Sequence, residues 1–191
     1  GLTPTRDWKL EARGASWKIG DTLNSGIGQG FMLSSPVQLA LMTARIATGR
    51  SIDAKLIRSR GGRPVTAPPA GEIGISESTL RAVREAMFVT SNQRKGTAYS
   101  PRIADRENAM AGKTGTGQVR RSTAAERAAG VFRNEDLPWN RRDHGLFVAF
   151  APYDAPRYAV SVVVEHGGSG SASAAPIARD ILMRALYGPV P

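Results

Sequence analysis

The chain has 191 residues, of which 41% are hydrophobic, and this is enough for one domain with its own core. It contains no cysteine and only two histidines, His144 and His166, so it excludes disulfides and thiolate sites, and we expect neither a metal nor a cofactor. The net charge of +10 suits an anionic partner, and nucleic acid, an anionic lipid surface and a plain solvated surface all fit it.

Nucleic acid is the least favoured of these partners. The arginines are scattered along the chain, and only three tryptophans and four tyrosines are present to stack on bases. The longest apolar run, residues 158–164, is far shorter than a membrane span. We therefore expect no nucleic acid among the partners.

The first strong helix signal begins at Ser35. Ser35 is a helix cap, Pro36 fits the first helical position, Gln38 can bond back to the cap, and Gly49 ends the helix. Apolar residues lie on nearly every side of this segment, which predicts a buried helix. The glycines of residues 26–30 predict tight turns beneath the helix, and a direct catalytic role for them is the less favoured interpretation.

The middle of the chain predicts a surface connection followed by a second helix. Residues 61–71 are rich in proline and glycine, and no separate core follows them, so they are not a domain linker. The next helix is predicted from about 77 to 90, with one apolar face formed by Leu80, Val83, Met87 and Phe88.

The last part of the chain predicts three strands and a helix. A strand is expected at about 109–120, and strands rich in aromatic and β-branched residues at 146–150 and 158–165, covered on both faces. The polar segment 121–142 is too long for a hairpin turn and is typical of a lid or a disordered loop. A final helix, from Pro176 to Gly188, is expected to lie on the sheet through a stripe of Ile177, Ile181, Leu182, Ala185 and Leu186.

Residues 111–119, with the sequence AGKTGTGQV, form the most informative motif. Lys113 supplies a compact positive charge, Thr114 a short hydroxyl donor, and Gly115 leaves room for a peptide along the strand edge. The motif predicts a strand that binds a carboxylate.

A nucleotide site is the rival interpretation of the glycine-rich segments. Gly112-Lys113-Thr114 matches the end of a phosphate-binding loop, but Glu107 occupies the place of its first glycine, and Gly115 disfavours a helix after the lysine. Residues 26–30 fail the dinucleotide pattern because Phe31 replaces its last glycine. Neither segment predicts nucleotide binding.

Five short motif segments occur in a fixed order along the chain: 25–31, 35–40, 113–116, 143–152 and 165–170. This order resembles the carboxyl-terminal half of the transpeptidase domain of class B penicillin-binding proteins of the elongation type. The resemblance implies an α/β (α+β) fold of the penicillin-binding and serine β-lactamase type, with an antiparallel sheet, three strands of it here, flanked by helices. It also implies that residues 1–191 are the carboxyl-terminal portion of a single transpeptidase domain.

Two motifs of that family are absent. The nucleophile of the family lies in Ser-x-x-Lys and its second motif is Ser-x-Asn; neither pattern occurs here, and nor does Thr-x-x-Lys. Because the family carries both ahead of the Gly-Gln-Gly segment, we expect the nucleophile-bearing portion to precede Gly1. We therefore expect the chain to be inactive alone, and to leave free the edge of strand 158–165 that does not pair with 146–150.

The resemblance implies a serine-type D,D-transpeptidase that cross-links peptidoglycan stem peptides through an acyl-enzyme and binds β-lactams. Lys113 would supply positive potential, the hydroxyls of Thr114 and Thr116 would bind the terminal carboxylate, and the Thr116 N–H would form half of the oxyanion hole. Gly115, Gly117 and Gln118 would line the substrate strand, although alanine is commoner in the family at the position of Gly117. His144 and His166 are predicted to have local structural roles rather than acid–base roles.

The resemblance also implies partners and a location. The partners are stem peptides, β-lactams, the remaining part of the parent chain and membrane proteins of the elongation machinery. The location is the periplasmic face of the bacterial inner membrane, with the anchor outside this sequence. A β-lactam sensor, or a catalytically inactive interaction module of the same fold, stays open as an alternative, and a basic nucleic-acid-binding domain is less favoured.

Overall fold

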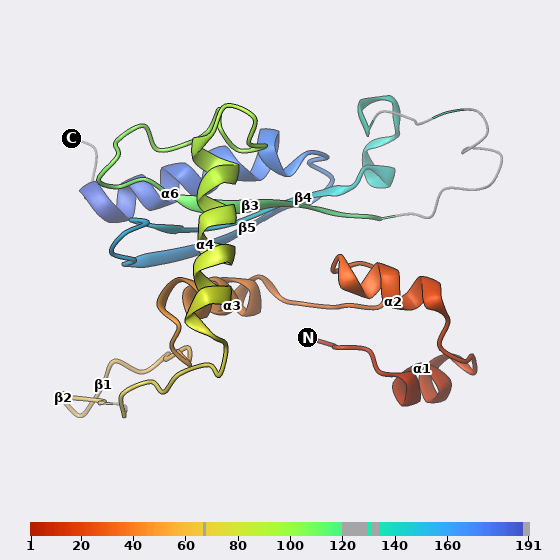
Figure 1. Ribbon diagram of the computed structural model, residues 1–191, viewed down its shortest axis with the longest axis horizontal. Coiled ribbons are helices and arrows are strands. Elements are labelled where there is room, and N and C mark those ends of the chain that lie inside the picture. The colour runs from red at the N-terminus through yellow and green to blue at the C-terminus, as the bar shows by residue number, and fades with distance from the viewer. Residues whose placement is uncertain (67, 120–129, 131–133, 189–191) are drawn as a thin grey trace.

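The centre of the computed structural model is a three-stranded antiparallel sheet in the order β3-β4-β5 (Figure 1). The structure describes residues 1–66, 68–119, 130 and 134–188. The strands are β3 (Ala111–Gly117), β4 (His144–Ala151) and β5 (Tyr158–Val164), so the three predicted strands are confirmed. Gly117 pairs with His144 at one end of the sheet. Within the described residues, β3 and β5 each leave one edge free, as expected for β5.

Helices cover both faces of the sheet. Helix α6 (Ala175–Tyr187) lies on one face, while α3 (Pro36–Thr48) and α4 (Glu77–Asn92) lie on the other (Figure 1). Phe147 and Phe150 stand three positions apart on β4, so their side chains point to opposite faces. Phe147 belongs to the core cluster under α6, and Phe150 to the cluster under α3 and α4. The predicted cover on both faces is confirmed.

Helix α3 begins and ends as its sequence predicts, but it is not buried all round. The Ser35 hydroxyl accepts a hydrogen bond from the Gln38 N–H, and Gly49 ends the helix with a left-handed φ of 69°. Thr43 and Ala47 are its buried residues, whereas Val37 is 61% and Met42 43% exposed. The prediction of full burial is wrong because the sheet and α4 cover one side of the helix, and an apolar surface does not by itself determine what covers it.

Helix α6 packs on the sheet through only part of the predicted stripe, because Leu182 is buried and Leu186 packs against the core, whereas the two isoleucines are exposed. Its buried residues are Ala175, Ala178 and Leu182, while Ile177 is 45% and Ile181 48% exposed. Small side chains let the helix backbone approach the sheet closely, and a period of 3.6 residues then turns both isoleucines away from it. Helix α4 runs two residues beyond its predicted end and buries Leu80 and Met87, whereas Val83 is exposed.

Shorter elements complete the architecture, and none was predicted from the sequence. Helices α1 (Arg6–Arg13) and α2 (Ile19–Gly26) lie beside the end of the sheet where β3 finishes (Figure 1). A small hairpin joins β1 (Ser59–Arg60) to β2 (Arg63–Pro64). Residues 134–142 contain the turns η1 (Asn134–Asp136) and η2 (Trp139–Arg141), and the π-helical turn η3 (Gly170–Ala174) leads into α6. The rest of the predicted lid or loop, apart from Gly130, lies outside the described residues.

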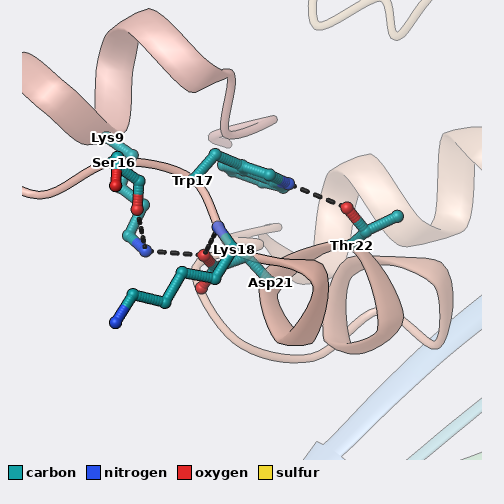
Figure 2. Close-up of polar contacts among 6 residues, drawn as sticks. All are labelled: Lys9, Ser16, Trp17, Lys18, Asp21 and Thr22. Carbon is teal, nitrogen blue, oxygen red and sulfur yellow. Dashed lines mark hydrogen bonds and ion pairs between the residues drawn. The ribbon is translucent and has the colours of Figure 1, made fainter.

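A partly buried ion pair holds α1 and α2 together. The Lys9 ammonium, which is buried, lies 2.6 Å from Asp21 Oδ2 and donates to the Ser16 carbonyl at 3.0 Å (Figure 2). Asp21 also accepts from the Lys18 N–H at 2.7 Å. The bond from Lys9, followed by the bond from Lys18, lowers the pKa of Asp21.

None of the described helices has the length and apolar composition needed to cross a membrane.

Candidate functional site: the free edge of strand β3

The free edge of β3 presents backbone groups that do not pair with β4. Asn92 Nδ2 donates to the Met110 carbonyl at 2.8 Å, Lys113 Nζ to the Thr114 carbonyl at 2.7 Å, and Gln29 Nε2 to the Thr116 carbonyl at 3.4 Å. These three carbonyls belong to residues an even number of positions apart and accept from groups outside β4, so all three face away from β4. Because the N–H and C=O of one strand residue leave the strand on the same side, the Thr114 and Thr116 N–H groups also face the free edge.

Three side chains of the motif bring a charge and two hydroxyls to this edge. Strand alternation places Lys113 on the opposite face from Thr114 and Thr116. The exposed Lys113 side chain nevertheless bends back, because its ammonium donates to the Thr114 carbonyl. The Thr114 hydroxyl lies 2.9 Å from the Thr97 hydroxyl, and the Thr116 side chain is exposed. A carboxylate at this edge would meet one full positive charge and at least two donors.

The glycines of the motif serve different structural purposes. A Cβ at Gly112 would collide with the Phe147 ring and lie 2.8 Å from the Val148 carbonyl, so this position requires glycine. A Cβ at Gly115 would meet only the Leu146 Cβ, at 3.4 Å, which is ordinary contact. Gly115 is instead approached from η3, since a Cβ built on Gly170 would lie 2.6 Å from the Gly115 carbonyl. The backbone of η3 therefore packs directly on the motif strand.

The end of β3 is tied to the start of β4. Gly117 pairs with His144, and Gln118 follows as an exposed residue. The Val119 N–H donates to Asp143 Oδ1 at 3.3 Å. The five predicted residues from Lys113 to Gly117 thus lie on one strand, and Gln118 lies just beyond it.

A cavity bordered by described residues lies at the opposite end of β3. It has a volume of about 620 Å³ and borders Ala109, which precedes the strand, together with Phe88 and Tyr153. None of the predicted site residues lines it. The described residues also contain no group of three or more His, Asp or Glu placed to hold a metal ion. The candidate site is therefore an open strand edge with no metal cluster among the described residues.

Residues 3–183 match the family model of the penicillin binding protein transpeptidase domain. The chain belongs to this family. It is 33% identical over 189 residues to the peptidoglycan D,D-transpeptidase MrdA of Salmonella typhimurium, a match that covers 95% of the chain and 30% of that relative. The chain thus spans about a third of the length of the curated relatives it matches.

Two solved structures of the same family resemble this chain over nearly its whole length. PBP2 of Pseudomonas aeruginosa superposes with a TM-score of 0.78 and 36% identity, covering 99% of this chain and 38% of that one. Helicobacter pylori PBP2, solved in a complex with MreC, gives a TM-score of 0.72 and 29% identity, covering 98% and 31%. The expected penicillin-binding transpeptidase fold, and the resemblance to elongation-type members, are confirmed.

Within this transpeptidase fold, the structure adds three residues to the candidate site that motif reasoning missed. Thr97 and Asp143 contact the strand only because the chain folds back on it, and the sequence contains no local signal for either contact. Gln29 does have a signal. It stands between Gly28 and Gly30, whose φ values of 72° and 79° confirm the predicted tight turn. The turn directs the Gln29 side chain at β3, whereas a Cβ at Gly28 would meet nothing within 4 Å, so the predicted position beneath α3 is wrong.

Proposed function

We propose that the chain forms the substrate-binding part of a peptidoglycan D,D-transpeptidase of the PBP2 type. The free edge of β3 carries this proposal, because Lys113 and the alternate N–H and C=O groups of Thr114 and Thr116 face it together. As the chain spans about a third of its relatives and has no Ser-x-x-Lys, the nucleophile would come from sequence beyond residues 1–191.

Substrate binding follows from the edge geometry. An extended stem peptide can add to β3 as a further strand, with its backbone paired to Thr114 and Thr116. Its terminal carboxylate would be attracted by the Lys113 ammonium and would accept hydrogen bonds from the two threonine hydroxyls. A β-lactam carries a carboxylate beside its reactive carbonyl and would bind the same groups.

Acyl transfer needs a donor for the developing oxyanion. The serine oxygen of the parent protein would attack the substrate carbonyl, release the terminal D-alanine as an amine, and later pass the acyl group to an amine of a neighbouring strand. The Thr116 N–H, at the free edge, would donate to the oxyanion, and the N–H of the nucleophile's own residue would be the second donor. One such donor is worth on the order of a hundredfold in rate.

Partners and location belong to the same proposal. The PBP2 of Helicobacter pylori, a relative, was solved in a complex with MreC, which favours an elongation-machinery partner for this protein too. We place the parent protein at the periplasmic face of the inner membrane, where peptidoglycan precursors are cross-linked. A β-lactam sensor of the same fold would acylate but would not turn over stem peptides.

Labelling with a fluorescent penicillin tests the proposal. The full-length protein is expected to be labelled covalently, and the 191-residue chain alone is not. A full-length protein that is folded and yet unlabelled would refute the transpeptidase function, and labelling of the isolated chain would refute the external nucleophile. Release of D-alanine from a pentapeptide by the full-length protein separates the transpeptidase from the sensor.

A further inference from the structure

Two histidines form a clasp beside the end of the motif strand. The His166 N–H donates to His144 Nδ1 at 2.9 Å, and the two ring centroids lie 4.8 Å apart. The His166 ring also contacts Trp139, at 4.4 Å between centroids, and its Nδ1 lies 2.9 Å from the Arg142 carbonyl. His166 has a left-handed φ of 55°, a conformation that a residue with a Cβ adopts only where its surroundings hold it.

The hydrogen bonds require Nδ1 of His144 to carry no proton and Nδ1 of His166 to carry one. Because a backbone N–H is always a donor, His144 Nδ1 must accept, so His144 has to be neutral with its proton on Nε2. Because a carbonyl is always an acceptor, His166 Nδ1 must donate, which a neutral or a protonated ring can do. Protonation of His144 alone therefore breaks the clasp.

The clasp positions a turn that reaches the substrate strand. The turn is fixed to the start of β4 by the His166 N–H bond and by a second bond, 2.8 Å long, from the Gly168 N–H to the Asp143 carbonyl. Two residues later, Gly170 lies so close to Gly115 that a Cβ would be 2.6 Å from the Gly115 carbonyl. A shift of this turn would therefore move the backbone that supports Gly115, between the two threonines of the motif.

Asp143 connects the same turn to the strand by a second route. Its carboxylate accepts from the Val119 N–H just beyond β3, and its own N–H donates to Asn134 Oδ1 at 2.9 Å. His144 follows Asp143 in the chain and pairs with Gly117. The clasp, the turn and the end of the motif strand thus form one connected group of contacts.

Charged residues of both signs lie on the segments next to His144. The acidic residues would favour its protonation and the basic ones would oppose it; they are Asp143, Glu165, Glu135 and Asp136, and Arg141, Arg142 and a protonated His166. Arg142 is held by bonds to the Leu137 and Glu135 carbonyls. Histidine is the side chain that ordinarily changes charge between about pH 5 and 8, and a proton added to His144 Nδ1 opens the clasp.

We propose that His144 is a positioning residue whose neutral imidazole holds the turn of residues 165–168, and through it strand β3, in the substrate-binding geometry, so that acylation declines when His144 is protonated. This inference rests on the proposed function. It adds a support from outside the motif to the strand that carries Lys113, Thr114 and Thr116.

The test compares acylation rates of the full-length protein with a fluorescent penicillin from pH 5 to 8.5. In H144N the amide oxygen replaces Nδ1 as acceptor and does not titrate, so the clasp persists at every pH. The wild-type rate divided by the H144N rate is expected to fall about fivefold from pH 8 to pH 5.5, because the wild type loses one hydrogen bond that H144N keeps. A ratio that stays constant over this range would overturn the proposal.

H166N is the matched control. Asparagine tolerates a left-handed φ and keeps the backbone N–H donor, but it removes the second titrating ring. H166N is expected to keep the wild-type dependence on His144, so loss of that dependence would assign the effect to His166 instead. H144A should be slow at every pH, and rescue of its rate by the asparagine variant separates hydrogen bonding from mere packing.

Hydrogen exchange gives a readout that does not depend on activity. After correction for intrinsic rates, peptides covering residues 165–170 should exchange faster at pH 5.5 than at pH 8 in the wild type, and equally in H144N. If the full-length protein is not acylated at any pH, the proposed function fails while this exchange result still decides the clasp. Equal exchange in the wild type at both pH values would refute it.

Discussion

The hydroxyl oxygens of Thr97 and Thr114 lie 2.9 Å apart, which joins the loop after α4 to the strand that carries the motif. Thr97 stands 17 positions before Thr114 and follows Gly96, where a Cβ would lie 2.6 Å from the Val89 carbonyl. The tight turn at Gly96 thus places the hydroxyl of Thr97 next to a donor proposed to bind the substrate carboxylate.

Thr97→Val tests that relationship. Valine keeps the shape of the side chain but removes the partner of the Thr114 hydroxyl, so acylation of the full-length protein should fall about fivefold with the fold unchanged. The rate constant for acylation by a fluorescent penicillin measures this fall. Thr90→Val is the matched control, since Thr90 bonds the Ala86 carbonyl within α4. Equal rates for both variants would show that Thr97 does not assist Thr114.

Lys113→Ala should slow acylation of the full-length protein on the order of a hundredfold, because the edge loses its full positive charge. The side chain is exposed, so circular dichroism and the melting temperature should remain close to those of the wild type. Lys95→Ala, at an exposed lysine beyond the end of α4, provides the comparison. A folded Lys113→Ala variant that is acylated at the wild-type rate would show that Lys113 does not belong to the site.

Gly170→Ala should destabilise the protein by about 3 kcal/mol, because the added methyl group would overlap the Leu146 and Gly115 carbonyls. Both carbonyls belong to the sheet and cannot move aside independently. Denaturant unfolding measures the change. Gly20→Ala is the control, since a Cβ there meets nothing within 4 Å. A neutral result at Gly170 would mean that η3 does not press on β3.

The Lys9–Asp21 pair predicts an acid-sensitive contribution to stability. The pKa of Asp21 is lowered in the folded protein from an ordinary value of 3.8, so its contribution is present above about that pH and is lost as pH falls through the lowered value. Melting temperatures from pH 6 to 2.5 should show this loss in the wild type and a smaller one in Asp21→Asn. Asp53→Asn, at an exposed pair with Arg45, should behave like the wild type.

The free edge of β5 predicts self-association of the isolated 191-residue chain. Its apolar strand exposes backbone groups that can pair with another chain, so light scattering should report oligomers that grow with concentration and only marginal stability. Val163→Lys places a charge on this edge strand and should reduce the association. A monomer that unfolds cooperatively over a wide concentration range would contradict this prediction.

The sequence by itself determined the longer helices, the three strands of the sheet and the family. Ser35, Pro36 and Gly49 define the limits of α3 through local hydrogen bonds and a left-handed φ, which depend only on neighbouring residues. The order of the short motifs indicated a penicillin-binding transpeptidase, and the pattern at residues 111–117 gave the strand of the candidate site. The helix limits and the strand could be predicted because their physical causes lie within a few residues of each other, and the family because each of its short motifs is local.

Only the tertiary structure decided which faces are covered and what contacts the motif strand. Val37 on α3 and Ile177 on α6 are as apolar as their buried neighbours, yet they remain exposed, because burial depends on where the sheet lies. Gln29 meets Thr116 across 87 positions of sequence, and His144 meets His166 across 22. Such contacts arise from the packing of whole elements against each other, and no local pattern in the sequence encodes that arrangement.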